Sequence, residues 1–136
     1  MAEAIFRHRI GDDADWEARS AGICAGGGSS ASANATEAVR ELQIDLQDHR
    51  SQPLTPALVR SSNLIVTMTD AHRLHILQKF PEVGNKVCLL NSFGTSKVPT
   101  DIADPFGGSL NVYKKTRDEI NQALSDLILF IRTEQP

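Results

Sequence analysis

The sequence predicts an α/β domain in which a mostly parallel sheet is flanked by helices. Two short segments, residues 63–69 and 86–90, have the continuous apolar middle of strands that are buried on both faces. A helical segment at about residues 70–80 lies between them, and strands that alternate with helices are typical of parallel sheets. A long amphipathic helix is predicted at about residues 109–133. Its apolar residues recur at helical spacing: Ile120, Leu124, Leu127, Ile128 and Ile131.

The first half of the chain has shorter and more varied signals. We expect it to open directly with a helix, without a strand before it. A turn rich in glycine and aspartate follows, at residues 11–15. We expect, in order, a helix at residues 2–9, a short strand at 16–23, a flexible segment at 26–30, a helix from 34 or 36 to 42, and a helix capped by Thr55 with Pro56 in its first position.

Length and composition indicate a soluble globular protein of one domain. The 136 residues are 40% hydrophobic and 23% charged, which is enough for a core of ordinary size. A net charge of -3 without a basic block excludes a strongly basic nucleic-acid-binding surface. The longest apolar stretch, residues 127–131, is far shorter than the roughly 20 residues of a membrane span. Two cysteines are too few for a disulfide framework, so we expect a cytoplasmic protein.

The segment with the clearest chemical content is Asp104-Pro105-Phe106-Gly107-Gly108, which we call the acid loop. It follows a buried strand, and ligands of open α/β sheets bind at the carboxyl ends of strands. Pro105 favours an extended Asp104, and Phe106 is placed to shield the carboxylate partly from water. Such an acid can protonate a leaving oxygen or nitrogen. Taken alone, the segment also fits an Asp-Pro turn that caps the next helix, which is the commoner use of a loop acid.

The neighbouring segments resemble the low-molecular-weight protein tyrosine phosphatases. The resemblance runs from Met1 to about Ile131 and depends on several ordered segments together. Phe106 after Asp-Pro, followed by two glycines, looks most like the bacterial protein arginine phosphatases of that family. The segments are Met1-Ala2-Glu3-Ala4-Ile5-Phe6-Arg7, Arg19-Ser20-Ala21-Gly22, His49-Arg50-Ser51, residues 63–69, Asp101-Ile102-Ala103-Asp104-Pro105-Phe106-Gly107-Gly108-Ser109 and Tyr113-Lys114-Lys115-Thr116-Arg117-Asp118-Glu119-Ile120.

The resemblance implies one phosphatase-like domain over residues 1–136, with a parallel four-stranded sheet flanked by helices. It implies that Asp104 is the general acid and then the base that activates water. Phe106 would line the substrate pocket. Ser20 would support the phosphate loop, although a serine here also fits helix packing or a strand end. The expected partner is a phosphorylated protein substrate, with phosphotyrosine and phosphoarginine both open, and no cofactor or metal is implied.

The family's nucleophile is a cysteine followed by five residues and an arginine. Its loop wraps one phosphate, and the helix that follows lowers the thiol pKa. Six positions after Cys24 is Ser30, and six after Cys88 is Gly94, so neither cysteine begins this motif. In the family, the loop and the first central strand precede the helix that corresponds to residues 2–9. We therefore expect an N-terminally truncated domain that lacks its first central strand and is inactive as given.

Two alternative hypotheses stay open, and a third lacks the residues that it needs. Another chain could supply the missing strand and loop. The chain could instead be a catalytically dead binding or regulatory module on the same scaffold. An arsenate reductase on this scaffold would need further redox cysteines, which two scattered cysteines do not supply.

Overall fold

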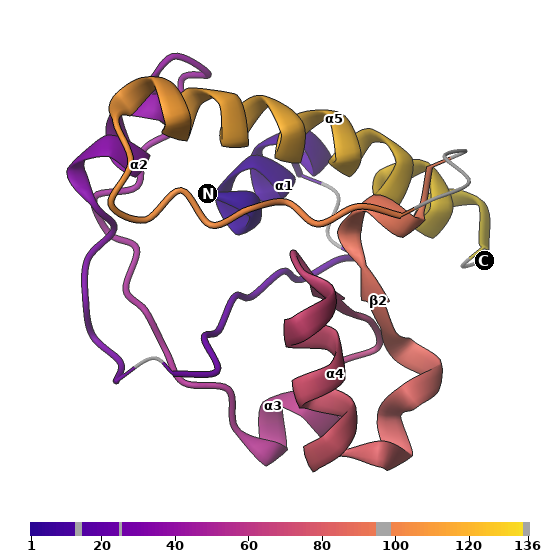
Figure 1. Ribbon diagram of the computed structural model, residues 1–136. Coiled ribbons are helices and arrows are strands. Elements are labelled where there is room, and N and C mark those ends of the chain that lie inside the picture. The colour runs from indigo at the N-terminus through magenta and orange to yellow at the C-terminus, as the bar shows by residue number, and fades with distance from the viewer. Residues whose placement is uncertain (13–14, 25, 95–98, 135–136) are drawn as a thin grey trace. The chain divides into compact units, whose positions relative to one another are not determined.

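The structure, a computed structural model, describes residues 1–12, 15–24, 26–94 and 99–134 (Figure 1). In chain order its elements are α1 (Ala2–Ile10), α2 (Ala33–Arg40), α3 (Pro56–Ser61), β1 (Ile65–Thr67), α4 (Asp70–Lys79), the 3-10 helix η1 (Pro81–Lys86), β2 (Val87–Leu89), the 3-10 helix η2 (Leu90–Ser92) and α5 (Leu110–Glu134). All five predicted α-helices are confirmed within a few residues. Among the described residues, no helix combines the length and the apolar character needed to cross a membrane.

Contacts within the chain group it into two compact units. Unit 1 comprises Met1–Pro53 and Asp104–Gln122, and unit 2 comprises Leu54–Ala103 and Ala123–Pro136. Helix α5 belongs to both, because its first part lies in unit 1 and the rest in unit 2. The acid loop therefore belongs to unit 1, whereas both strands belong to unit 2.

The parallel sheet lies in unit 2. Strands β1 and β2 pair in parallel, with Val66 opposite Cys88 at the centre of the register. Helix α4 connects them and contacts both, and Figure 1 shows it beside β2. This arrangement is the β-α-β unit that the alternation of segments predicts. Of the four strands that the resemblance implies, the described residues form these two.

Both strands are shorter than their apolar segments. The predicted strand at residues 63–69 ends at Thr67, because Thr69 is the N-cap of α4 and its hydroxyl accepts a hydrogen bond from the N–H of His72 at 3.2 Å. A residue that caps a helix leaves the strand ladder. The strand at 86–90 begins at Val87, because Lys86 closes η1. The ammonium of Lys86 donates to the carbonyl of Ser62 at 2.6 Å, just after the end of α3.

The core of unit 2 forms between α3, α4, η1 and the sheet. Four buried residues make its centre: Val59, Ile76, Val83 and Val87. Leu54, Ile65, Leu77 and Phe80 pack against them. Thr55 and Pro56 begin α3 as predicted, and the Thr55 hydroxyl accepts from the N–H of Leu58 at 3.1 Å.

The predicted strand at residues 16–23 is wrong. In the described residues of this segment, pairing is limited to a single bridge between Gly22 and Pro53. Its backbone carbonyls bond to side chains: the guanidinium of Arg7 donates to the Ala18 carbonyl at 3.0 Å, and the Gln52 amide donates to the Ser20 carbonyl at 2.9 Å. Backbone groups that are satisfied by side chains in this way do not form a strand ladder.

Helix α2 and the first part of α5 carry the buried face of unit 1. Ser32 caps α2 and accepts from the N–H of Ala35 at 3.2 Å, and α2 buries Ala35, Ala38 and Val39. The predicted apolar face of α5 is confirmed, since all five of its residues are buried; Ile120 belongs to unit 1 and the other four belong to unit 2. Tyr113, Thr116 and Arg117 extend this buried face toward the start of α5. A buried arginine at such a position requires partners for its charge.

Candidate active site

The acid loop is a tight turn held by two local hydrogen bonds. The N–H of Gly108 donates to the carbonyl of Pro105 at 2.8 Å, and Gly107 has a φ of 79°. A positive φ at the third of four residues is the mark of a type II turn, and glycine adopts it without strain. The carboxylate of Asp104 accepts from the N–H of Phe106 at 3.0 Å. Asp104, the candidate catalytic acid, therefore also stabilises the turn to which it belongs.

The second glycine of the loop is needed for space. A Cβ atom at Gly108 would lie 2.9 Å from the carbonyl oxygen of Pro105 and 2.9 Å from a methyl group of Val112. Both distances are too short for carbon, and one of the atoms belongs to the backbone, which moves at higher cost. The two glycines thus serve different purposes, one for conformation and one for packing.

Asp104 and Phe106 both face solvent. Asp104 is exposed, and 84% of the surface of Phe106 is exposed. The expected shielding of the carboxylate by the Phe106 ring is therefore not seen. The reason is the turn geometry, which engages the carboxylate with the backbone N–H of Phe106. An accessible carboxylate can still exchange protons with a substrate in either direction.

The residues just before the acid loop are fixed within unit 2. The carboxylate of Asp101 accepts from the N–H of Asp70, the first residue of α4, at 2.8 Å. The N–H of Ile102 donates to the carbonyl of Met68 at 2.9 Å, and Ile102 is buried. A carboxylate at a helix N-terminus satisfies an N–H that lacks a partner within the helix and suits the helix dipole. Sequence reasoning treated Asp101 only as part of the motif and did not find this role.

Ser20 lies in a second polar cluster of unit 1. Its hydroxyl donates to the carboxylate of Glu3, on the first turn of α1. Glu3 also pairs with Arg7 at 2.9 Å, and the Nδ1 atom of His49 lies 3.9 Å from it. The carboxylate of Glu3 therefore connects α1 to the segments of Ser20 and His49, while the support of a phosphate loop by Ser20 stays a prediction.

Sequence reasoning also missed a contact between α2 and the acid loop. The side-chain amide of Asn34 donates to the carbonyl of Gly108 at 3.2 Å. The two residues are 74 positions apart, and both belong to unit 1. The sequence alone does not distinguish an asparagine that makes this contact from one that caps its own helix.

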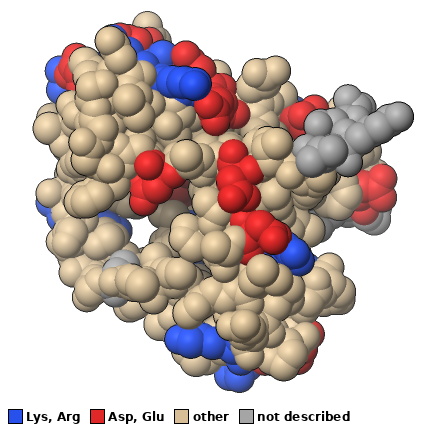
Figure 2. Space-filling view, in the orientation of Figure 1, with Lys and Arg blue, Asp and Glu red and all other residues tan. Residues whose placement is uncertain are grey.

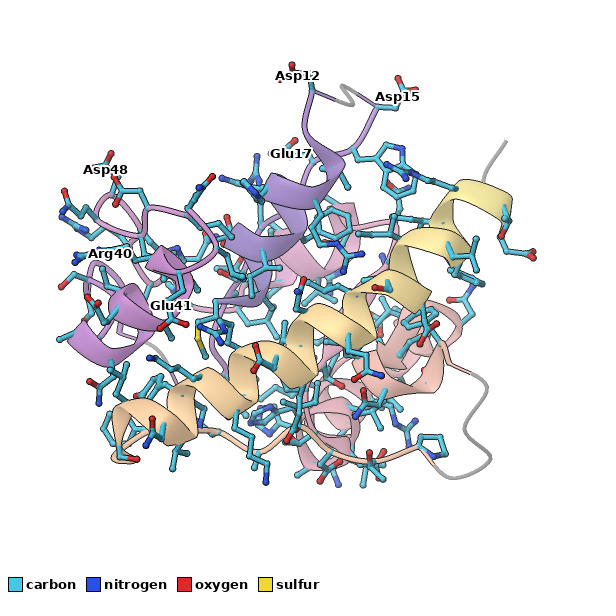
Figure 3. The ribbon with its side chains drawn as sticks, turned by 90° about the horizontal axis from the view of Figure 1, so that it is seen from above. Asp12, Asp15, Glu17, Arg40, Glu41 and Asp48 are labelled. Carbon is cyan, nitrogen blue, oxygen red and sulfur yellow. The ribbon has the colours of Figure 1, made fainter. Side chains whose placement is uncertain are left out.

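A cluster of charges joins the end of α2 to α5. Arg117 is only 8% exposed, and its guanidinium donates to the carbonyl of Ala38 at 2.7 Å and to the carboxylate of Glu41 at 2.6 Å. Glu41 also pairs with Lys114 at 2.5 Å, and Figure 3 shows it at the end of α2, on the side toward α5. Asp118 completes the cluster, accepting from Arg117 at 2.9 Å. Figure 2 shows basic and acidic side chains next to one another in part of this face, whereas other acidic side chains there stand apart from basic ones.

The cluster shifts the pKa values of its members in opposite directions. Hydrogen bonds from Lys114 and, to a smaller extent, from Arg117 lower the pKa of the Glu41 carboxyl below its ordinary value of 4.5. The hydrogen bond to Asp118, with a further one to Glu41, raises the pKa of Arg117. Both shifts favour the charged forms, which is what a paired cluster requires.

Replacing Glu41 with Gln should make the free energy of unfolding less dependent on pH in the acid range. Because the folded pKa of Glu41 is lowered, its contribution is present above pH 4.5 and is lost as the pH falls through the folded pKa. The free energy of unfolding, measured with urea at several pH values, should therefore decline less in Glu41→Gln than in the parent. Glu37→Gln is the matched control, because Glu37 pairs with Arg40 on the exposed surface of α2, the helix that ends just before Glu41. Parallel curves for the parent and Glu41→Gln would contradict the assignment.

The two cysteines differ in their surroundings. Cys24 is exposed, and Cys88 is partly buried on β2 opposite Val66. Burial raises the pKa of the Cys88 thiol, and the charge of Arg73 opposes this only in part. A raised pKa favours the unreactive thiol. Among the described residues, no group of three or more His, Cys, Asp or Glu is placed to hold a metal ion.

Comparison with known families shows the family to which the chain belongs. The model of the family "Low molecular weight phosphotyrosine protein phosphatase" matches residues 1–136. The chain belongs to this family. The low-molecular-weight phosphatase fold, with its parallel sheet and flanking helices, therefore accounts for β1, α4 and β2.

Its relatives within the low-molecular-weight phosphatase family include arginine phosphatases. The chain is 39% identical over 130 residues to the protein-arginine-phosphatase of Bacillus subtilis (strain 168), covering 93% of this chain and 84% of that protein. It is 37% identical over 119 residues to the protein-arginine-phosphatase of Geobacillus stearothermophilus, covering 88% and 79%. A solved mutant of YwlE arginine phosphatase with a phosphorylated active site serine has a TM-score of 0.91 and 36% identity, covering 98% of this chain and 88% of that one.

Proposed function

We propose that the chain serves the dephosphorylation of protein phosphoarginine or phosphotyrosine, with Asp104 as the acid and base. The observation that carries the proposal is the acid loop, an exposed carboxylate held beside an exposed aromatic ring in a defined turn. Membership of the phosphatase family supports the interpretation of this carboxylate as an acid and base. A phosphorylated protein in the cytoplasm is the partner that we expect.

The proposed reaction has two steps. A cysteine thiolate attacks phosphorus, the bond from phosphorus to the substrate nitrogen or oxygen breaks, and Asp104 gives its proton to that leaving atom. Water then attacks the cysteinyl-phosphate, the carboxylate of Asp104 takes a proton from the water, and the sulfur–phosphorus bond breaks. The thiolate belongs to a Cys-x5-Arg loop, a motif that the 136 residues do not contain.

Phosphoarginine is the substrate that two observations favour. Two relatives that are 39% and 37% identical are protein-arginine-phosphatases. Phe106 presents a flat ring without a hydroxyl, and planar guanidinium groups stack on aromatic faces. Phosphotyrosine stays the alternative, because its ring also stacks on Phe106.

The chain by itself should not turn over a phosphate ester by this route. We expect no hydrolysis of an aryl phosphate by the 136-residue protein, because the reaction needs a thiolate and an arginine fork around the phosphate. Hydrolysis that is measurable above background and is lost in Asp104→Ala would overturn this expectation.

A hybrid protein tests the function itself. The first strand and Cys-x5-Arg loop of a family member would be joined in front of Met1, and hydrolysis of phosphoarginine and phosphotyrosine peptides would be compared. We expect turnover of phosphoarginine to have the higher kcat/KM. A folded hybrid that binds these peptides without turnover would refute the catalytic proposal and favour the binding module.

A further inference from the structure

The side chain of Asn34 connects α2 to the acid loop. Asn34 is the second residue of α2, in a first turn that the Ser32 hydroxyl already caps. Its amide is therefore not used as the helix cap, and it donates outward to the carbonyl of Gly108 at 3.2 Å. The bond is partly buried, so water competes for it less than at an exposed site.

The carbonyl of Gly108 needs a partner from outside the α5 helix. The hydrogen bonds of α5 begin one residue later, where the carbonyl of Ser109 accepts from the N–H of Tyr113 at 3.1 Å. A backbone carbonyl that helix bonds do not use is satisfied by a side chain or by water. The Asn34 amide fills this requirement, and its donor cannot be replaced by an acceptor.

Three hydrogen bonds lead from Asn34 to the acid. Asn34 donates to the carbonyl of Gly108, whose N–H donates to the carbonyl of Pro105 at 2.8 Å. The N–H of Phe106 then donates to the Asp104 carboxylate at 3.0 Å. Since Gly108 has no space for a Cβ atom, its packing leaves the turn little freedom to move alone. The backbone of the turn therefore connects the Asn34 amide to the carboxylate of Asp104.

The opposite end of α2 is held by Arg117. Its guanidinium bonds to the carbonyl of Ala38 and to Glu41, one residue beyond α2. Helix α2 is thus fixed at both ends to the segment that contains the acid loop and the start of α5. A helix held in this way is a rigid support for a catalytic loop.

We propose that Asn34 is a positioning residue for Asp104, which rests on the proposed function of Asp104 as the acid. Asn34 does not touch substrate. It acts by holding the turn that fixes the carboxylate, and α2 supplies the support.

The variant Asn34→Asp separates this role from the stability of α2. Aspartate has nearly the same size but donates no hydrogen bond, so the bond to Gly108 is lost. A negative charge in the first turn also suits the helix dipole, so α2 should be at least as stable as in the parent. Asn34→Ala removes the same bond without the charge. Thr36→Ala is the control, because the Thr36 hydroxyl donates to the carbonyl of Ser32 at 3.0 Å within the α2 segment.

Amide hydrogen exchange in the full 136-residue chain provides the measurement. In Asn34→Asp and Asn34→Ala, exchange at the N–H groups of Phe106 and Gly108 should accelerate by about threefold to tenfold, as expected for the loss of one hydrogen bond. Thr36→Ala should leave both rates unchanged. The proposal is wrong if neither Asn34 variant changes these rates, or if Thr36→Ala changes them equally.

The hybrid protein links the same variants to catalysis. A misplaced acid should lower kcat and leave KM nearly unchanged, because the acid acts in the chemical step. Exchange that accelerates as expected, with unchanged kcat in an active hybrid, would refute the positioning role. A hybrid without activity would count against the proposed function only, since the exchange experiment needs no turnover.

Discussion

Replacing Asp104 with Asn in the hybrid protein should lower kcat by roughly 10²- to 10⁴-fold, the usual contribution of a general acid or base. Asparagine keeps the size of the side chain and an oxygen that accepts from the N–H of Phe106, so the turn should persist. It has no proton to give to the leaving atom and no carboxylate to activate water. The loss is therefore specific to the chemical step.

The leaving group sharpens this prediction. An aryl phosphate with an acidic phenol departs without much help, whereas a guanidine or a tyrosine oxygen needs a proton. Rates of the first step, measured in single turnovers, should fall more for phosphoarginine than for an activated aryl phosphate. Asp48→Asn, at another exposed aspartate of unit 1, should leave all rates unchanged. An equal loss for both substrates in Asp104→Asn would show that Asp104 does not act as the acid.

Replacing Arg117 with Leu should lower the free energy of unfolding by about 2 to 3 kcal/mol, a loss typical of breaking hydrogen bonds to a charged group. Arg117 is 8% exposed, and its bonds to Ala38 and Glu41 join α2 to α5. Leucine keeps the apolar contacts of the stem but leaves the Ala38 carbonyl without this donor. Because Glu41 is 46% exposed, water replaces part of its lost partner and keeps the cost below that of a fully buried pair.

Urea denaturation provides the comparison for Arg117. Arg40→Leu is the matched control, because Arg40 is an arginine of α2 that pairs with Glu37 on the exposed surface. Such a pair contributes about 0 to 1 kcal/mol, so the midpoint should move little. Arg117→Lys should fall between the two, since an ammonium cannot reproduce the fork of the guanidinium. Equal effects of Arg117→Leu and Arg40→Leu would contradict the role of the cluster.

Local signals predicted most of the fold. Thr55-Pro56 identified the start of α3, because a hydroxyl cap and a proline at the first position act within one turn. The spacing of Ile120, Leu124 and Ile131 identified the buried face of α5. The segment at residues 16–23 failed, because its carbonyls bond to side chains of Arg7 and Gln52 that no local pattern reveals. Strand pairing is a property of neighbours in space, whereas a cap is a property of neighbours in sequence.

The acid loop shows the same division. The sequence by itself determined that a turn lies at residues 104–108, because proline restricts the backbone beside it and glycine adopts a positive φ without strain. Only the tertiary structure decided that the Asp104 carboxylate accepts a hydrogen bond from the N–H of Phe106 and that the Phe106 ring faces solvent. It also decided that the Asn34 amide donates to the carbonyl of Gly108. The Asn34 contact joins residues 74 positions apart, so it depends on the packing of α2 against the start of α5, which no local preference reveals.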